Sequence, residues 1–145
     1  MGNSTDPRLM ISVSGIRGRV GHGLSPEVVA RYAAAFGAWA IATGPSRAVV
    51  LGRDSRVSGP IFHQIARASL EAAGANVIDL GMTTTPTLQM AVEHHHAAGG
   101  LCITASHNPI EWNALKFIGP SGLFLSADEG REMRALVESG IPYAT

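Results

Sequence analysis

Apolar and polar positions along the chain form two kinds of segment. Short apolar runs with the length of β-strands alternate with longer segments in which apolar residues recur at helical spacing, which is the pattern of a layered α/β domain. We therefore expect residues 1–145 to form a single three-layer α/β/α domain around a mixed, mostly parallel sheet. The expected strands lie within residues 9–15, 47–54, 75–81, 99–106 and 114–119.

Local stop and start signals bound the first two expected helices. The first helix follows Ser25 and Pro26, an N-cap residue with proline at the first helical position. The second runs from about residue 59 to 73 and ends at Gly74, because glycine readily adopts the left-handed conformation that terminates helices. We expect Val28, Tyr32, Phe36 and Trp39 of the first helix to pack in the core, and the second helix carries Ile61, Ile65, Ala68 and Ala72 on one side.

The other two expected helices follow the third and fifth expected strands, residues 75–81 and 114–119. One begins near Thr85 and Pro86 and ends among the consecutive histidines 94–96. The last one opens with the capping box Ser126-Ala-Asp-Glu129. Its inward side carries Met133, Leu136 and Val137.

Composition narrows the possible partners and compartments. The net charge is zero and basic and acidic residues are interspersed, so neither nucleic acid nor an anionic membrane is an expected partner. The longest apolar stretch, residues 33–42, is too short to cross a bilayer, and the polar N-terminal segment 1–10 lacks the apolar centre of a secretory signal. We expect a cytoplasmic domain in which the single cysteine, Cys102, is an inert buried thiol.

Three segments after expected strands carry polar side chains, and ligands collect at that edge of an open α/β sheet. The first, 14–23, combines glycines with Arg17 and Arg19, which suits an anion, although an ordinary glycine-rich turn explains it equally well. In the second, 52–59, Asp54 lies between two arginines. It is either a catalytic carboxylate or half of an internal ion pair. We favour the ion pair because neighbouring guanidinium groups lower the pKa of a carboxyl group and make it a poor general acid.

The three consecutive histidines 94–96 are candidate metal ligands by residue type, but their spacing argues against a metal site. Consecutive side chains on a helix point about 100° apart and do not converge on one ion. Cationic side chains at a helix C-terminus are favoured by the helix dipole without any further role.

The third segment, 104–117, contains Ser106 followed by His107 and Asn108. A serine hydrolase is disfavoured, because the G-x-S-x-G elbow is missing and neighbours on an extended chain point to opposite sides. A serine that carries a phosphoryl group fits better: Asn108 donates hydrogen bonds, and His107 and Lys116 supply positive charge. Lys116, the only lysine, is a candidate proton-transfer group, with an ordinary surface lysine as the alternative.

These motifs resemble the α-D-phosphohexomutases, the family of phosphoglucomutase, phosphomannomutase and phosphoglucosamine mutase. The resemblance rests on "TASHNP" at 104–109 and "NALK" at 113–116, with "SGIRG" at 14–18 and "GRDSR" at 52–56 in the same order. It implies that Ser106 is the phosphoryl carrier and that His107 and Asn108 line the phosphate. It also implies that Arg17 and Lys116 stabilise charge or transfer protons near the transferring group.

The resemblance further implies a longer, multi-domain enzyme of which this chain is the N-terminal domain. Expected cofactors are a phosphoserine at Ser106, a sugar 1,6-bisphosphate intermediate, and Mg²⁺ bound through the Ser106 phosphate and by ligands outside this chain. Expected partners are a hexose phosphate substrate and the C-terminal domains of the same polypeptide. Ala114 stands where relatives usually have glycine, which leaves the subfamily open. The choice among glucose, mannose and glucosamine phosphates stays open because the resemblance places the sugar-selecting residues outside this chain.

Three hypotheses for function follow. The chain is the phosphoserine domain of a magnesium-dependent hexose phosphate mutase that is inactive by itself, a phosphate-binding module without turnover, or, least favoured, a serine hydrolase. Continuation of the natural reading frame into an aspartate-rich metal loop would separate the first hypothesis from the second.

Overall fold

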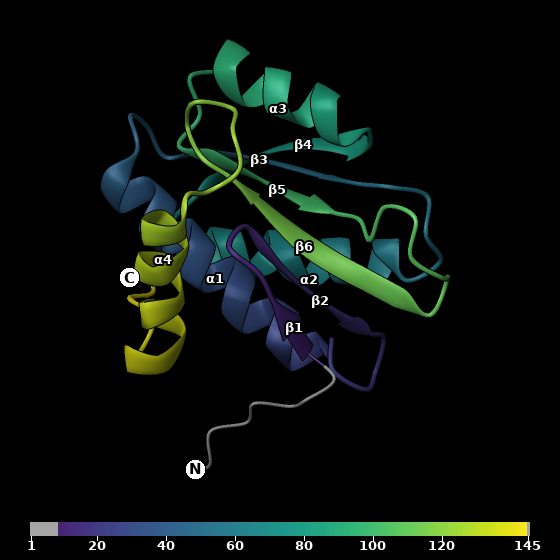
Figure 1. The fold of residues 1–145 in the computed structure, drawn as a ribbon. Helices are drawn as coiled ribbons and strands as arrows, with labels where there is room; N and C mark the ends of the chain where they lie inside the picture. Colours follow the sequence, from purple (N-terminus) through teal and green to yellow (C-terminus); the bar gives the residue numbers. More distant parts are fainter. Residues whose placement is uncertain (1–8, 145) are drawn as a thin grey trace.

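The computed structural model describes residues 9–144, which form one six-stranded sheet with four helices (Figure 1). The N-terminal segment whose export signal we considered lies mainly in residues 1–8, outside the described residues. In chain order the elements are β1 Leu9–Ile11, β2 Gly15–Arg19, α1 Pro26–Thr43, β3 Ala48–Arg53, α2 Gly59–Ala72, β4 Asn76–Met82, α3 Thr85–His94, β5 Gly99–Ile103, β6 Trp112–Ile118 and α4 Ala127–Ser139.

The sheet is mixed, as the sequence predicted. Its strand order is β1-β2-β6-β5-β3-β4. Parallel pairing is confined to β5, β3 and β4, whereas β1, β2 and β6 pair antiparallel with their neighbours. Parallel neighbours need a crossover helix, and α2 and α3 supply the crossovers for β3, β4 and β5. Loops without a helix join β1 to β2 and β5 to β6, whereas β2 and β6 are far apart in the chain.

Helices cover both faces of the sheet, which confirms the three-layer architecture. Figure 1 shows α3 alone on one face and α1, α2 and α4 on the other. The larger apolar core lies under α1, α2 and α4 and contains Phe36, Leu70 and Phe117. The smaller core lies under α3 and contains Val50, Leu88 and Ile118. Because α3 packs on β3 and β5, it leaves β1 and β2 uncovered on its side of the sheet.

The predicted capping signals are confirmed. The Ser25 hydroxyl accepts the Val28 N–H at the start of α1, and Ser126 and Glu129 form both hydrogen bonds of the capping box at the start of α4. Gly74 follows α2 with a φ of +97°. The predicted apolar faces are packed in the core as well: Tyr32, Phe36, Trp39 and Met133 are buried, and Val28, Leu136 and Val137 are partly buried against them.

The core-facing side of α2 differs from the apolar stripe identified in the sequence. Ile61 is 59% exposed, whereas Phe62, Ala66 and Leu70 are completely or almost completely buried. Two apolar stripes at helical spacing run along this helix, one residue apart. The stripe with Leu70 faces α1. A Cβ on Gly37 of α1 would lie only 3.1 Å from the Leu70 side chain, so the glycine lets the two helices approach closely.

The N-terminal strand was predicted wrongly as one run over residues 9–15. The chain turns at residues 12–14, and β2 pairs antiparallel with both β1 and β6. Only one large apolar residue, Ile16, is buried in β2, so the sequence lacks the alternation that marks a strand. Gly15 permits the pairing with β6, because a Cβ there would lie 2.5 Å from the Leu115 carbonyl oxygen.

Two further expectations concern the interior and the membrane. Cys102 is buried as predicted, and burial raises the pKa of its thiol. Within residues 9–144, no helix combines the length and apolar character that a bilayer crossing requires.

Candidate active site

The three polar segments meet at one edge of the sheet, as the sequence predicted. The first segment contains β2, and the other two lie at the ends of β3 and β5; the C-terminal ends of these three strands lie at the same edge. Backbone hydrogen bonds join them: the Val20 N–H donates to the Glu111 carbonyl at 2.8 Å, and the Asp54 N–H donates to the Ile103 carbonyl at 3.0 Å. Side chains from three distant parts of the sequence therefore share one site.

Ser106 lies on the surface in the loop between β5 and β6, with a left-handed backbone conformation (φ +54°). This conformation costs a non-glycine residue about 1–3 kcal/mol and persists only where its surroundings impose it. Two hydrogen bonds within the loop contribute to it: the Ser106 N–H donates to the Thr104 hydroxyl at 3.0 Å, and the Asn108 N–H donates to the Ala105 carbonyl at 3.0 Å. The turn presents the Ser106 hydroxyl to solvent.

Lys116 is the hydrogen-bond partner of that hydroxyl. The lysine lies within β6, where its backbone is opposite Gly15 of β2 and Cys102 of β5. Its ammonium Nζ donates to Ser106 Oγ at 2.7 Å. A short charge-assisted hydrogen bond of this kind is stronger than one between neutral groups. The structure thus brings together the serine and the lysine that the sequence singled out.

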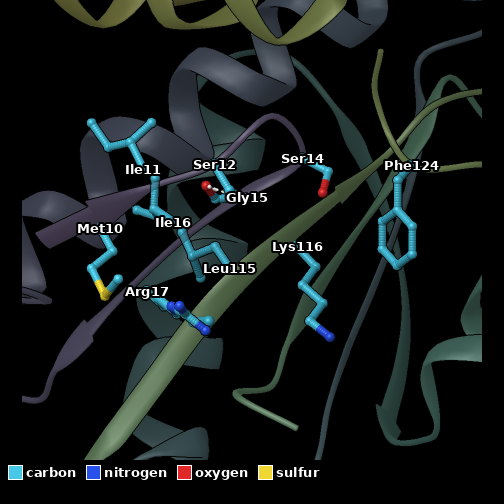
Figure 2. A pocket seen from close by; sticks show the side chains of 11 residues that line it. Met10, Ile11, Ser12, Ser14, Gly15, Ile16, Arg17, Leu115, Lys116 and Phe124 are labelled. Atoms are coloured by element: carbon cyan, nitrogen blue, oxygen red, sulfur yellow. Dashed lines mark hydrogen bonds between the residues drawn. The ribbon is translucent and has the colours of Figure 1, made fainter. Parts of the chain in front are cut away.

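Arg17 lies beside Lys116, although in a strand and not in the loop where we expected it. In the antiparallel register Arg17 is opposite Ala114, two residues from Lys116, so both cationic side chains leave the same face of the sheet. They line an open groove of about 390 Å³ together with Phe124 and the apolar residues of β1 (Figure 2). The groove adjoins the Ser106 hydroxyl through Lys116 and has two cationic groups and no carboxylate in its lining.

His107 and Asn108 follow the serine in the same loop. The His107 side chain is exposed and the Asn108 residue is half-buried. Within residues 9–144, the side chains of these two residues donate no hydrogen bond, and Ser106 Oγ is bonded to Lys116 and not to His107. The arrangement therefore differs from the serine–histidine pair of a hydrolase, in which the imidazole bonds the serine hydroxyl.

Asp54 is a structural partner within the site. Its Oδ2 accepts the Thr104 hydroxyl at 2.6 Å and its Oδ1 accepts the backbone N–H of Arg56 at 3.1 Å. The Nε of Arg56 lies 3.3 Å from the same carboxylate. These contacts agree with the ion pair that the sequence favoured over a catalytic carboxylate. They also link Asp54 through Thr104 to the backbone of Ser106.

Sequence reasoning expected Arg56 only as an ion-pair partner of Asp54, and it missed Thr104. Both stand inside the motifs on which the family resemblance rests, but neither carries reactive chemistry. We call residues 104–112, which join β5 to β6 and include the first residue of β6, the serine loop. Arg56 donates four hydrogen bonds to its carbonyl oxygens. The only local signal was the spacing Asp54-x-Arg56, in which an aspartate accepts the N–H two residues further on.

The histidines 94–96 lie at the other edge of the sheet. The backbone carbonyl of His96 accepts a hydrogen bond from the Ser46 hydroxyl. Because Ser46 lies just before β3, His96 lies near the N-terminal end of that strand. The His94 and His95 rings contact each other edge to face, with centroids 5.0 Å apart. Within residues 9–144, no group of three histidine, cysteine or acidic side chains is arranged to hold a metal ion.

Comparisons with known proteins agree with this geometry. The family model described as "Phosphoglucomutase/phosphomannomutase, alpha/beta/alpha domain I" matches residues 8–143. A phosphoglucosamine mutase of Synechococcus sp. is 44% identical over 83% of this chain, and a phosphoglucomutase/phosphomannomutase of Thermococcus kodakarensis is 40% identical over 86% of it. The matched part is 26% of each relative's length.

A putative phosphomannomutase of Thermus thermophilus has the same fold, with a TM-score of 0.82, 30% identity, and coverage of 93% of this chain and 31% of that one. A phosphoglucomutase/phosphomannomutase family protein of Burkholderia thailandensis superposes with a TM-score of 0.78 and 27% identity, over 94% of this chain and 32% of that one. The chain thus spans about a quarter to a third of these proteins. With its family-model match over nearly the entire length and its α/β/α architecture, the chain belongs to the phosphoglucomutase/phosphomannomutase family, as a domain I.

Proposed function

We propose that this chain is the phosphoserine-bearing N-terminal domain of an enzyme that interconverts hexose 1-phosphate and hexose 6-phosphate. The carrying observation is the 2.7 Å hydrogen bond from Lys116 Nζ to the exposed hydroxyl of Ser106. The mutases named among the relatives support a sugar phosphate as substrate. Their names include phosphoglucosamine mutase and phosphoglucomutase/phosphomannomutase, so the hexose is glucose, mannose or glucosamine.

In the proposed reaction, phosphoserine 106 transfers its phosphoryl group to a hydroxyl of the sugar monophosphate. The bond from phosphorus to Ser106 Oγ breaks, a bond from phosphorus to the sugar oxygen forms, and a sugar 1,6-bisphosphate results. Ser106 Oγ takes up a proton from Lys116, and the proton released by the sugar hydroxyl restores the ammonium group. The bisphosphate then turns around, and Ser106 takes back the phosphoryl group at the other end of the sugar.

The other site residues have electrostatic roles in this proposal. Transferring phosphoryl groups carry spread negative charge, which positioned cations and hydrogen-bond donors stabilise. Arg17 supplies a fixed guanidinium charge in the groove beside Lys116. His107 and Asn108, which follow Ser106 directly, donate to the oxygens of its phosphate.

Mg²⁺ is part of the same proposal. A phosphate on Ser106 offers the oxygen ligands that this hard cation prefers, and the exposed position of Ser106 leaves room for them. The described residues hold no group of three further ligands, so the remaining ligands would come from outside them. When bound, the ion would neutralise charge on the phosphoryl oxygens.

The alternative is a phosphate-binding domain without turnover. It needs the same cationic groove but no phosphorylation of Ser106. The experiment that separates the two is phosphosite mapping by mass spectrometry on the complete polypeptide, together with turnover of glucose, mannose and glucosamine 1-phosphates. We expect a phosphate on Ser106, and turnover that falls by several orders of magnitude in Ser106→Ala.

Ser121→Ala is the matched control, because Ser121 is also an exposed loop serine and lies after β6, outside the lining of the groove. We expect it to keep both the phosphate on Ser106 and wild-type turnover. Phosphate found only on another residue, or full turnover in Ser106→Ala, would reject the proposal.

A further inference from the structure

The side chain of Arg56 donates hydrogen bonds to several backbone carbonyl groups of the serine loop. The loop carries the chain from the end of β5 to the start of β6, and its backbone carbonyl groups converge on the side chain of Arg56, about 50 residues earlier in the sequence. Nη1 donates to the carbonyls of Pro109 at 2.8 Å and Trp112 at 3.0 Å, and Nη2 donates to those of Ser106 at 2.8 Å and Asn108 at 2.7 Å.

The planar guanidinium explains why a single side chain bonds so many carbonyl groups. It presents five N–H donors in a fixed fork, whereas a lysine ammonium has three donors on one atom. The Arg56 side chain is only 11% exposed, so water offers the carbonyl groups little replacement. Its charge is balanced by Asp54, whose carboxylate lies 3.3 Å from Nε.

The same network reaches Ser106 from its other side. Asp54 accepts the hydroxyl of Thr104, and the Thr104 hydroxyl oxygen accepts the N–H of Ser106. The carbonyl of Ser106 is therefore bonded to Arg56 directly, and its N–H is linked to Asp54 through the Thr104 hydroxyl. This is the residue with the left-handed backbone, which the local chain would not adopt unaided.

We propose that Arg56 is a positioning residue for phosphoryl transfer: it fixes the backbone of the serine loop so that Ser106 Oγ stays within reach of Lys116. Arg56 contacts neither the hydroxyl nor the groove, so it acts through the loop and not on the substrate. The kinetic part of this inference rests on the proposed mutase function. The conformational part does not.

The test uses Arg56→Lys in the complete polypeptide. Lysine keeps the positive charge and most of the length, but it does not reach carbonyl groups on both sides of the loop. The first readout is amide hydrogen exchange of the loop hydrogen bonds, which are the N–H groups of Ser106, Asn108 and Trp112. We expect these amides to exchange about tenfold faster, since one net hydrogen bond corresponds to roughly that factor.

The second readout is kinetic. Misplacement of a reacting group by about 1 Å costs on the order of 100-fold in rate. We therefore expect kcat to fall by about that factor while KM changes little, because Arg17 and the rest of the groove are untouched. Arg67→Lys is the matched control: it makes the same change on a half-exposed arginine of α2 that pairs with Glu71, far from the serine loop. We expect the control to match wild type in both readouts.

Four results decide between the explanations. Unchanged exchange of the loop amides in Arg56→Lys would overturn the proposal, and so would equally faster exchange throughout the domain, since that indicates general destabilisation. Faster loop exchange with wild-type kcat would overturn its kinetic part. If wild type carries no phosphate on Ser106 and isomerises no sugar phosphate, the mutase function fails, and the exchange data still decide whether Arg56 sets the loop conformation.

Discussion

Removal of the Thr104 hydroxyl tests the hydrogen bonds that link the Asp54 carboxylate to the backbone of Ser106. Thr104 is 6% exposed, and its hydroxyl makes two hydrogen bonds, one donated to the Asp54 carboxylate at 2.6 Å and one accepted from the Ser106 N–H at 3.0 Å. Thr104→Val keeps the shape of the side chain and removes both bonds. The matched control, Thr104→Ser, keeps the hydroxyl and loses only a methyl group.

The expected magnitude follows from these contacts. A hydrogen bond to a charged group contributes about 1.5–3 kcal/mol and a neutral one about 1 kcal/mol. The Asp54 carboxylate keeps its contact with Arg56, which offsets part of the loss. We expect Thr104→Val to lower the free energy of unfolding by about 2–4 kcal/mol. Thr104→Ser should cost about 1 kcal/mol, as is typical for one buried methyl group.

The assay is reversible urea unfolding of the 145-residue chain followed by circular dichroism, with thermal unfolding as a check. For a domain of this size each kcal/mol shifts Tm by about 3 °C. Equal stability of Thr104→Val and Thr104→Ser would show that the hydroxyl network contributes nothing and would refute the reasoning. A loss in Thr104→Val above about 5 kcal/mol would also contradict it, because the two bonds do not account for that much.

Three further predictions concern catalysis, autonomy and pH. In the complete polypeptide, Lys116→Ala should lower kcat by about 10²–10⁴-fold with a smaller effect on KM. Lys116→Arg should restore only part of the activity, because guanidinium does not readily release a proton. A near-wild-type kcat of Lys116→Ala in steady-state kinetics would remove the lysine from the mechanism. The 145-residue chain by itself should unfold cooperatively on heating and show no mutase activity, and magnesium-dependent turnover would contradict this expectation. For Asp79, desolvation has the largest single effect and raises the pKa, but the Gly81 N–H, His63 and Arg67 together lower it below its usual value of 3.8. The stabilisation by this carboxylate is therefore present above pH 3.8 and is lost as pH falls through the lower folded-state pKa. Wild type should lose more stability than Asp79→Asn between about pH 5 and pH 3. Parallel curves of stability against pH would exclude this linkage.

The candidate site was partly predictable because its reactive residues stand close together in the sequence. Ser106, His107 and Asn108 share one loop, and Lys116 follows on the next strand. Arg17 was identified by its chemistry but assigned to a loop, since nothing local shows that residues 15–19 pair with β6. Arg56 was expected only as an ion-pair partner of Asp54. Its hydrogen bonds to the serine loop were not predicted, because the four acceptors are backbone carbonyl groups, which every sequence has.

The sequence by itself determined the features that depend on neighbours along the chain. The cap at Ser25, the capping box at Ser126 and the stop at Gly74 involve bonds or backbone angles within about four residues, so residue type and spacing suffice to specify them.

Only the tertiary structure decided which of two apolar stripes on α2 faces α1 and where β2 pairs. It also decided that the carbonyl groups of the serine loop surround Arg56. These outcomes depend on contacts between residues tens of positions apart, where several arrangements satisfy the local preferences equally well. The choice among them is made by close approach at Gly15 and Gly37 and by the satisfaction of polar groups at the sheet edge.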